Sequence, residues 1–254
     1  MTRIVNNCVA LVCLCLFWGQ SLRAADASHS EQIKWGNESV FNEEHNTLGL
    51  FSGVLGGQIV LAGGTSDDYS RWGRNAVCLS ENAGFALYED VLSKPLAYGA
   101  SITLSDGILC IGGRDSSQCY KDVFLVTMQQ GKLNVSEDWP PLPFPLSNAA
   151  GALLDNKVYL FGGRKSVSPS RLSDSFFVLD LSNKSRGWKE LPGYPGCVRE
   201  DAILVVQNNG VSPCLYLLGG QTETEEGLSS CLTDGYVYNP QLGKWSSLGS
   251  DFPK

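Results

Sequence analysis

The sequence predicts an all-β fold of the β-propeller class, with four-stranded antiparallel sheets arranged around a common axis. The first marker is a pair of glycines that ends an apolar strand. The second glycines of these pairs are Gly64, Gly113, Gly163 and Gly220. Their spacings of 49, 50 and 57 residues lie near the fifty-residue period of radial sheet arrays. The second marker is an aromatic residue 24 to 26 positions after each pair. These aromatic residues are Tyr88, Trp139, Trp188 and Trp245.

The third repeat shows the expected order of strands most clearly. Residues 149–163, AAGALLDNKVYLFGG, predict two strands joined by a turn at residues 155–157. Residues 174–181 predict a third strand, and residues 187–192 predict a fourth. The same order recurs in residues 99–113, 120–126 and 137–143 of the second repeat and in residues 202–220, 235–240 and 243–248 of the fourth. Each repeat is therefore expected to form an antiparallel meander, which is one propeller blade.

Both markers have a structural explanation. Paired glycines let the backbone bend and approach a neighbour closely, where a side chain would obstruct the contact. A tryptophan on the outer strand offers an area on the order of 200 Å² to cover the neighbouring sheet. We therefore interpret the glycine pairs and the tryptophans as parts of the scaffold.

The chain divides into three predicted segments. Residues 1–27 combine a basic start, a short apolar run and an Ala-x-Ala pattern, which predicts an export signal and a secreted or periplasmic protein. Residues 28–46 are expected to form an N-terminal arm in which Trp35 marks the outer strand of a closing blade. Residues 47–254 are expected to form the blades. The sequence lacks inner strands for the closing blade, which favours a truncated ring; a complete four-bladed ring with a loose arm is the alternative.

Composition limits the partners. The net charge is −7 and no Lys/Arg run occurs, which argues against nucleic acid or an anionic membrane and favours a small or protein partner. No segment after the export signal is apolar for long enough to cross a membrane. The sequence has no Cys-x-x-Cys pair, and His29 and His45 both precede the first full blade, so no metal or other cofactor is expected.

Six cysteines follow the predicted export signal. An oxidising compartment would allow them to form disulfides in fifteen different pairings. Cys110 and Cys214, however, lie inside apolar strands, where cysteine usually packs as a small apolar residue.

The glycine pairs, the apolar strands before them and the spaced tryptophans resemble the kelch repeat over residues from about 47 to 249. Within kelch proteins, residues 95–113, 120–126 and 195–209 (PLAYGASITLSDGILCIGG, YKDVFLV and PGCVREDAILVVQNN) resemble the cyclically permuted family of sialate mutarotase, or N-acetylneuraminate epimerase. This resemblance implies a ring of six blades and an acidic sugar as ligand.

The order of strands in a meander predicts where functional residues gather. The start of the innermost strand and the end of the second strand lie at the same end of a blade, so the loops after the glycine pairs share one rim with the linkers between blades. The rim residues expected from the loops are Arg114, Arg164 and Arg171, and those expected from the linkers are Tyr98, Asn148, Arg199 and Glu200. Four arginines at one rim predict a carboxylate ligand. Alternatively, single arginines are solvated or pair with Asp115, Asp174 or Asp201.

The family resemblance also implies a chemistry. Mutarotation opens and recloses a sugar ring, so one group takes the anomeric hydroxyl proton and another donates a proton to the ring oxygen. The suspected site in the family is a glutamate after one glycine pair and an arginine shortly before the third strand. Arg171 matches that arginine, whereas Arg164 and Gln221 stand where the glutamate would be. This departure argues against the enzyme activity, or moves the acid/base role to Glu200, to Glu223, Glu225 or Glu226, or to blades that a truncated ring would lack.

The sequence thus predicts a mutarotase or epimerase of N-acetylneuraminic acid or a related acidic sugar, impaired if the ring is truncated. Arg171 and Glu200 are its expected catalytic residues. The expected ligand-binding residues are Arg114, Arg164, Arg199, Tyr98 and Asn148. The alternative is a non-catalytic kelch module that binds a glycan or a protein, because the fold alone does not fix function.

Overall fold

The computed structural model describes residues 48–80, 84–224 and 227–249. They belong to the compact unit Val40–Lys254. The predicted export signal and the N-terminal arm with Trp35 lie outside the described residues, as do His29, His45, Glu225 and Glu226. No helix among the described residues is long and apolar enough to span a membrane.

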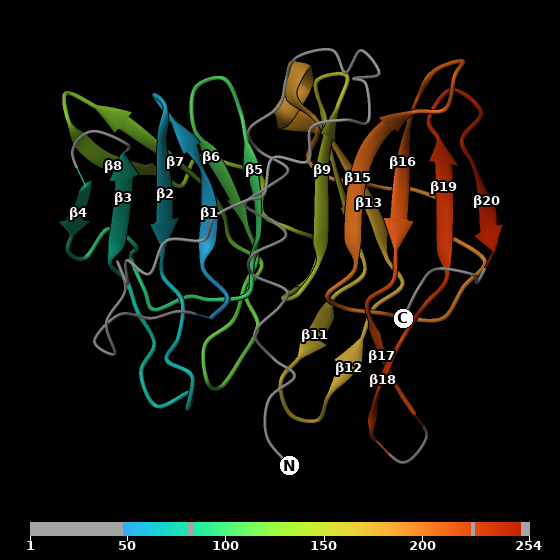
Figure 1. Cartoon of the computed structure of the whole chain (residues 1–254), viewed down its shortest axis with the longest axis horizontal. Coiled ribbons are helices and arrows are strands. Elements are labelled where there is room, and N and C mark those ends of the chain that lie inside the picture. Colours follow the sequence, from blue (N-terminus) through green and yellow to red (C-terminus); the bar gives the residue numbers. More distant parts are fainter. Residues whose placement is uncertain (1–47, 81–83, 225–226, 250–254) are drawn as a thin grey trace, which may run out of the picture. The chain divides into compact units, whose positions relative to one another are not determined.

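The described chain forms four antiparallel meanders of four strands each, with the strands in sequence order in every sheet (Figure 1). Blade 1 consists of β1 (Phe51–Leu55), β2 (Gln58–Ala62), β3 (Ala76–Ser80) and β4 (Gly84–Tyr88). Blade 2 consists of β5 (Ala100–Thr103), β6 (Ile108–Ile111), β7 (Val123–Gln129) and β8 (Lys132–Ser136). Blade 3 consists of β9 (Ala150–Leu154), β10 (Lys157–Phe161), β13 (Phe176–Asp180) and β14 (Lys189–Glu190). Blade 4 consists of β15 (Ile203–Asn208), β16 (Pro213–Leu218), β19 (Gly235–Asn239) and β20 (Lys244–Gly249). The predicted four-bladed, all-β propeller arrangement is confirmed.

Local sequence explains the tight turns within the blades. β9 and β10 are joined by Asp155 and Asn156, whose φ angles are +50° and +58°. Two consecutive left-handed residues make the hairpin turn whose twist matches the flanking strands, and Asp and Asn tolerate this conformation. The predicted turn is therefore confirmed, with Lys157 already the first residue of β10.

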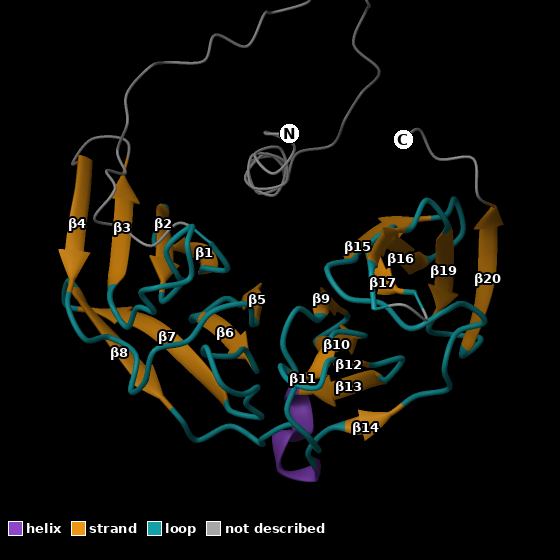
Figure 2. Ribbon diagram, turned by 90° about the horizontal axis from the view of Figure 1, so that it is seen from below, coloured by secondary structure: helices purple, strands orange, loops and turns teal. Residues whose placement is uncertain are grey.

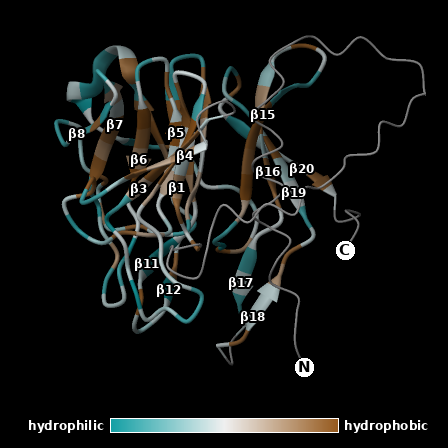
Figure 3. Cartoon of the chain, turned by 60° about the vertical axis from the view of Figure 1, so that its left-hand side comes forward, coloured by the Kyte–Doolittle hydropathy of each residue, from teal (hydrophilic) through white to brown (hydrophobic). Residues whose placement is uncertain are grey.

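The blades pack on one another through their apolar faces. Figure 2 shows the four sheets following one another in chain order, with β1, β5, β9 and β15 on the inner side. Phe51 and Val60 of blade 1 share a buried cluster with Ile108 and Phe124 of blade 2. Two similar clusters join blade 2 to blade 3 and blade 3 to blade 4. Figure 3 shows the hydrophobic colouring concentrated on the strands of the sheets.

The spaced tryptophans contribute to these junctions, as predicted. Trp139 and Trp188 pack against the cluster between blades 2 and 3, and Trp245 packs against the one between blades 3 and 4. Trp188 of blade 3 also donates its indole N–H to the carbonyl of Pro140, in the linker after blade 2, at 2.9 Å. Each indole therefore covers apolar surface where two sheets meet.

The glycine pairs are needed because the linker of the following blade approaches them closely. Gly162 has φ +66°, and a Cβ atom there would lie 2.5 Å from the carbonyl oxygen of Arg199. The next residue, Gly163, donates its N–H to that same oxygen at 2.8 Å. Gly64 and Gly113 donate in the same way to the linkers before blades 2 and 3, each at 2.8 Å.

The fourth strand of blade 2 differs from the prediction. The strand is β8, and residues 137–143 are a linker that follows it. Gln130 and Gly131, with φ angles of +49° and +73°, make a tight turn directly after β7, so the chain returns earlier than expected. Pro140 and Pro141 lack the N–H that a strand ladder requires.

Two short hairpins were not predicted. They begin directly after the third and fourth glycine pairs and extend beyond the ends of the blades (Figure 1). The first joins β11 (Arg164–Ser166) to β12 (Arg171–Leu172), and the second joins β17 (Gln221–Glu223) to β18 (Ser229–Cys231). Within the described ranges, the remaining regular element is the 3-10 helix η1 (Leu181–Arg186), which follows β13.

The six cysteines after residue 27 are all unpaired. Cys110 and Cys214 are fully buried within their strands, as the sequence predicted. The structure therefore contains none of the disulfides that the cysteine count allowed.

Candidate functional site

The structure brings the residues after the glycine pairs next to the residues before the inner strands. Backbone bridges pair Ala97 with Arg114, Ser147 with Arg164, and Glu200 with Gln221. Each bridge joins one blade to the linker that precedes it, so the same rim position recurs from blade to blade.

A second series of backbone contacts runs along this rim. Tyr98 donates its N–H to the carbonyl of Gly49 at 2.7 Å, Asn148 donates to Tyr98 at 2.6 Å, and Asp201 donates to Asn148 at 3.0 Å. All four residues have φ angles between +52° and +64° and stand two residues before an inner strand. Their shared left-handed conformation turns each linker into the inner strand. The side chain of Asn148 also donates to Oδ1 of Asp201 at 2.9 Å.

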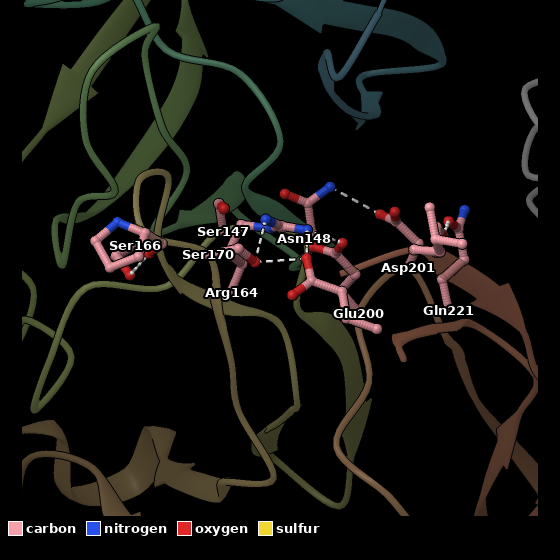
Figure 4. A network of polar contacts seen from close by, with 12 residues as sticks. Ser147, Asn148, Arg164, Ser166, Ser170, Glu200, Asp201 and Gln221 are labelled. Carbon is pink, nitrogen blue, oxygen red and sulfur yellow. Dashed lines mark hydrogen bonds and ion pairs between the residues drawn. The ribbon is translucent and has the colours of Figure 1, made fainter. Parts of the chain in front are cut away.

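Arg164 is the centre of a polar network that joins blades 3 and 4 (Figure 4). Its Nε donates to Oε2 of Glu200 at 2.9 Å, and its Nη2 contacts Oε1 of the same carboxylate. Nη2 also donates to Oε1 of Glu223 at 3.0 Å, and Nη1 donates to Oγ of Ser170 at 2.6 Å. The hydrogen bond to Glu200 raises the pKa of Arg164 above its already high value, so the guanidinium stays charged.

The two glutamates of this network differ in whether a carboxylate oxygen remains without a hydrogen-bond partner. Glu200 is buried, and both its oxygens are occupied by Arg164. Glu223 uses Oε1 for Arg164 and for the hydroxyl of Ser170. No described residue hydrogen-bonds to Oε2 of Glu223, and its side chain is 27% exposed. Glu223 is therefore better placed than Glu200 to exchange a proton with a ligand.

Arg199 does not take the position expected of a ligand-binding residue. Its side chain is fully buried and donates from Nη1 and Nη2 to the two carboxylate oxygens of Asp234 at 2.7 and 2.8 Å. It also donates to the hydroxyl of Tyr194 and to the carbonyl of Gly219, both at 2.8 Å. Each nitrogen of the guanidinium therefore has a hydrogen-bond partner inside the protein. Through these bonds Arg199 connects blade 4 to the linker that precedes it.

Arg171 lies at the start of β12. Its side chain makes none of the hydrogen bonds of the Arg164 network. Its side chain is exposed, and none of the carboxylates in the described part of the chain forms an ion pair with it. Its backbone pairs with Ser166 across the short hairpin.

Arg114 occupies an aromatic environment. Its Cζ atom lies 4.7 Å from the ring centroid of Tyr98 and 5.2 Å from that of Trp72. Tyr69 stacks on Tyr98 with ring centroids 6.5 Å apart and an interplanar angle of 19°. Sequence reasoning found Arg114 and Tyr98 but missed Tyr69 and Trp72. The available signal was the pair of aromatic residues in the polar loop that follows the first glycine pair.

The loop that carries Tyr69 and Trp72 is held by its own polar side chains. The carboxylate of Asp68 accepts hydrogen bonds from the hydroxyl of Ser66 at 2.6 Å and from the N–H of Ser70 at 3.0 Å. These bonds lower the pKa of Asp68 to about 2. Trp72 donates its indole N–H to the carbonyl of Tyr69 at 3.1 Å, which links the two aromatic residues.

The site shows no metal-binding arrangement. Within the described ranges, no group of three or more His, Cys, Asp or Glu residues is placed to hold a metal ion. The described residues of the rim instead offer arginines, carboxylates and aromatic rings, which suit a polar organic ligand with a negative charge.

Comparisons with known proteins agree with the fold and the family resemblance. Residues 139–254 match the family model of N-acetylneuraminate epimerase. N-acetylneuraminate epimerase from Yersinia pestis (strain Pestoides F) is 30% identical over 121 residues, which are 47% of this chain and 28% of that protein. The corresponding protein from Haemophilus influenzae (strain PittEE) is 30% identical over 119 residues, covering 47% of this chain and 29% of that protein. The matched region thus spans less than a third of either relative.

Two further similarities concern the repeat and the fold. A kelch domain-containing protein from Vibrio cholerae is 31% identical over 115 residues, which cover 45% of this chain and 29% of that protein. The solved structure of YjhT superposes with a TM-score of 0.61 at 13% identity, covering 79% of this chain and 68% of that one. At this identity the likeness shows the fold alone.

The repeats, the meanders and the kelch relative define the class: this chain is a kelch-type β-propeller. Within that class, its residues 139–254 carry the sequence features of N-acetylneuraminate epimerases, and the resemblance predicted from the sequence is confirmed.

Proposed function

We propose that this protein is a mutarotase or epimerase of N-acetylneuraminic acid or a related acidic sugar. The observation that carries the proposal is the Arg164 network, in which a charged arginine positions Glu223 and leaves its Oε2 atom without a described partner. The family model that matches residues 139–254 and the names of the two epimerase relatives support the same substrate class.

The chemistry requires one proton to leave and another to arrive. A base removes the proton of the anomeric hydroxyl, the bond between the anomeric carbon and the ring oxygen breaks, and a carbonyl forms while the ring oxygen is protonated. Reclosure on the other face of the carbonyl reverses these transfers and gives the other anomer. Glu223 is our proposed proton-transfer group, because an unpaired carboxylate oxygen beside a fixed cation can reach a ligand and accept its proton.

The predicted roles of the other rim residues change accordingly. Glu200, with both oxygens held by Arg164, becomes a residue that positions the arginine. Arg164 in turn holds Glu223. Arg171 is assigned no contact with the reacting atoms, because its exposed side chain has no partner in the Arg164 network.

We also propose that the protein acts outside the cytoplasm, secreted or in the periplasm. The support is the export-type pattern of the first 27 residues. Expressing the full chain in a bacterial host and determining the N-terminus of the mature protein tests this proposal. Cleavage near residue 27 supports it, and an intact cytoplasmic chain contradicts it.

The activity is tested by anomer exchange of N-acetylneuraminic acid, followed by proton NMR. The full chain is expected to accelerate exchange over the spontaneous rate. Glu223→Gln keeps the shape and the hydrogen bond to Arg164 but cannot take a proton, so it is expected to lower the enzymatic rate about 100-fold. The matched control is Glu190→Gln, on the exposed strand β14, which is expected to leave the rate unchanged.

The outcomes separate the two candidate functions. A full chain that binds the sugar without accelerating exchange supports the non-catalytic kelch module that the sequence left open. Equal rates for the wild-type protein and Glu223→Gln would show that the proton is transferred elsewhere.

A further inference from the structure

The four rim arginines predicted from the sequence are not equivalent. Arg164 is bound to two glutamates and Arg199 to Asp234, so the charges of both are matched inside the protein. Arg171 is exposed at a hairpin. Arg114 differs from all three, because aromatic rings hold its guanidinium and no described carboxylate forms an ion pair with it.

The acidic residues near Arg114 are engaged elsewhere. Oδ1 of Asp115 accepts from the N–H and the hydroxyl of Ser117 and from the N–H of Gln118, while Oδ2 accepts from the hydroxyl of Tyr120. Asp201 accepts from the side-chain amide of Asn148. The internal pairing that would have neutralised Arg114 therefore does not form.

The position of Arg114 is fixed from both backbone and side chain. Its N–H donates to the carbonyl of Ala97 at 2.8 Å, and its own carbonyl accepts from the N–H of Ala97 at 2.9 Å. The rings of Tyr98 and Trp72 lie at an interplanar angle of 60° and contact the guanidinium. No described residue accepts a hydrogen bond from the Arg114 side chain, so its N–H groups are able to bind a carboxylate in bidentate fashion.

The aromatic group also offers a surface of its own. Tyr69 is 49% exposed, and it connects to Trp72 through the indole hydrogen bond and to Tyr98 through ring stacking. Burial raises the pKa of Tyr98, so its hydroxyl remains a neutral donor. Sugars present an apolar face of C–H groups that aromatic rings can cover, and polar groups at the edge then fix the orientation.

This group lies on the same rim as the Arg164 network. Tyr98 and Asn148 are consecutive members of the backbone series along the rim, and Arg114 and Arg164 hold the same position after their glycine pairs.

We propose that Arg114, held by Tyr98 and Trp72, binds the carboxylate of an acidic sugar, and that the exposed ring of Tyr69 and the half-buried ring of Trp72 receive an apolar face of that sugar. The assignment rests on the proposed function for the class of ligand. It adds a binding role for Tyr69 and Trp72, and it assigns the carboxylate contact to one of the four arginines.

Binding of N-acetylneuraminic acid and of its methyl ester to the full chain tests the proposal, using calorimetry or ligand-observed NMR. The wild-type protein is expected to bind the acid at least about tenfold more tightly than the uncharged ester, as for loss of one charged hydrogen-bonding pair. Arg114→Gln is expected to remove this preference while retaining binding of the ester. Tyr69→Leu removes an exposed ring that has no described contact with Arg114, and it is expected to weaken binding of acid and ester by the same factor.

Controls keep the test independent of folding. Arg186→Gln, in η1 beyond the far end of β13, changes an exposed arginine without affecting the rim and is expected to keep the wild-type preference. Circular dichroism checks the fold of each variant. Arg114→Lys retains the charge but loses the planar fork, and it is expected to keep only part of the preference.

Three results would overturn the proposal. They are a wild-type protein that binds neither compound, a wild-type protein that binds both equally, and an Arg114→Gln variant that still prefers the acid. Anomer exchange, measured separately, reports on the proposed function. Preferential binding of the acid without anomer exchange would contradict the proposed enzyme activity and leave the assignment of Arg114 intact. Anomer exchange together with an unchanged preference in Arg114→Gln would support the activity and contradict the assignment of Arg114.

Discussion

Neighbouring residues decide what each rim arginine does. Arg199 follows the same blade-linker pattern as Leu96 and Leu146, whose carbonyls also accept from a glycine pair. The leucines fill apolar space, whereas the arginine at the equivalent position requires a buried acceptor, which Asp234 supplies. A charged group at a packing position is tolerated only when it is paired and hydrogen-bonded.

Removing the carboxylate of Asp234 should therefore destabilise the protein strongly. Asp234→Ala leaves a fully buried guanidinium without its ion pair, and we expect the free energy of unfolding to fall by about 3 kcal/mol. Urea denaturation followed by circular dichroism measures the change. Asp122→Ala is the matched control, because Asp122 pairs with Lys94 at a solvent-accessible site and should cost less than about 1 kcal/mol.

The same ion pair gives the sign of a pH effect. Hydrogen bonds from Arg199 lower the pKa of Asp234 relative to the unfolded chain. The stability that this ion pair contributes is therefore fully present above the pKa of Asp234 in the unfolded chain. It is lost as the pH falls through the lower pKa that Asp234 has in the folded protein. A loss of stability on acidification that is as large in Asp234→Ala as in the wild-type protein would contradict this assignment.

At the scale of the element, the glycine pairs act as the contact points between blades. Gly162 and Gly131 both have left-handed backbones, with φ angles of +66° and +73°. A Cβ atom at Gly162 would collide with the carbonyl of Arg199, whereas at Gly131 it would meet nothing within 4 Å. Comparing the two positions therefore distinguishes the energetic cost of a left-handed backbone from the cost of a collision with the next linker.

Alanine substitutions measure that difference. Gly131→Ala should lower the free energy of unfolding by about 1 to 2 kcal/mol, the cost of a left-handed alanine. Gly162→Ala should cost clearly more, because the linker must also move and the hydrogen bond from Gly163 to Arg199 is disturbed. Equal values in urea denaturation would mean that the glycine is required only for its backbone angle.

The sequence predicted those elements whose cause is local. The turn at Asp155 and Asn156, the apolar strands and the glycine pairs each carry their signal within a few residues, and all were found. β8 was misplaced because the tight turn at Gln130 and Gly131 outweighed the regular spacing of the tryptophans. The short hairpins after the third and fourth glycine pairs have no strong alternation of apolar residues, so no pattern indicated them.

The sequence predicted which residues lie at the rim, but it did not predict which side chains pair with them. Strand order alone was enough to place Arg114, Arg164 and Glu200 at one rim. The partners that decide their roles come from distant parts of the chain, such as Asp234 for Arg199 and Glu223 for Arg164. Whether an arginine faces a carboxylate or an aromatic ring depends on how two blades pack, and a single sequence does not contain that information in any local pattern.

On the scale of the whole described unit, the stabilising contacts between blades join each blade to the next one along the chain. Three separate apolar clusters join blade 1 to 2, blade 2 to 3 and blade 3 to 4. The hydrogen bonds at the glycine pairs likewise connect each blade only to the linker of the next. In such an arrangement a local defect weakens its own junction first, as in proteins built from stacked repeats.

Hydrogen exchange measured by mass spectrometry can test this arrangement with two variants at different junctions. Asp234→Ala should lower amide protection in β10, β15 and β16 more than in β1 and β2, because Arg199 connects blades 3 and 4. Gly63→Ala should show the opposite pattern, because its Cβ atom would collide with the carbonyl of Leu96 at the junction of blades 1 and 2. If both variants lose protection equally in all blades, the unit opens as a single cooperative structure and the junctions are not independent.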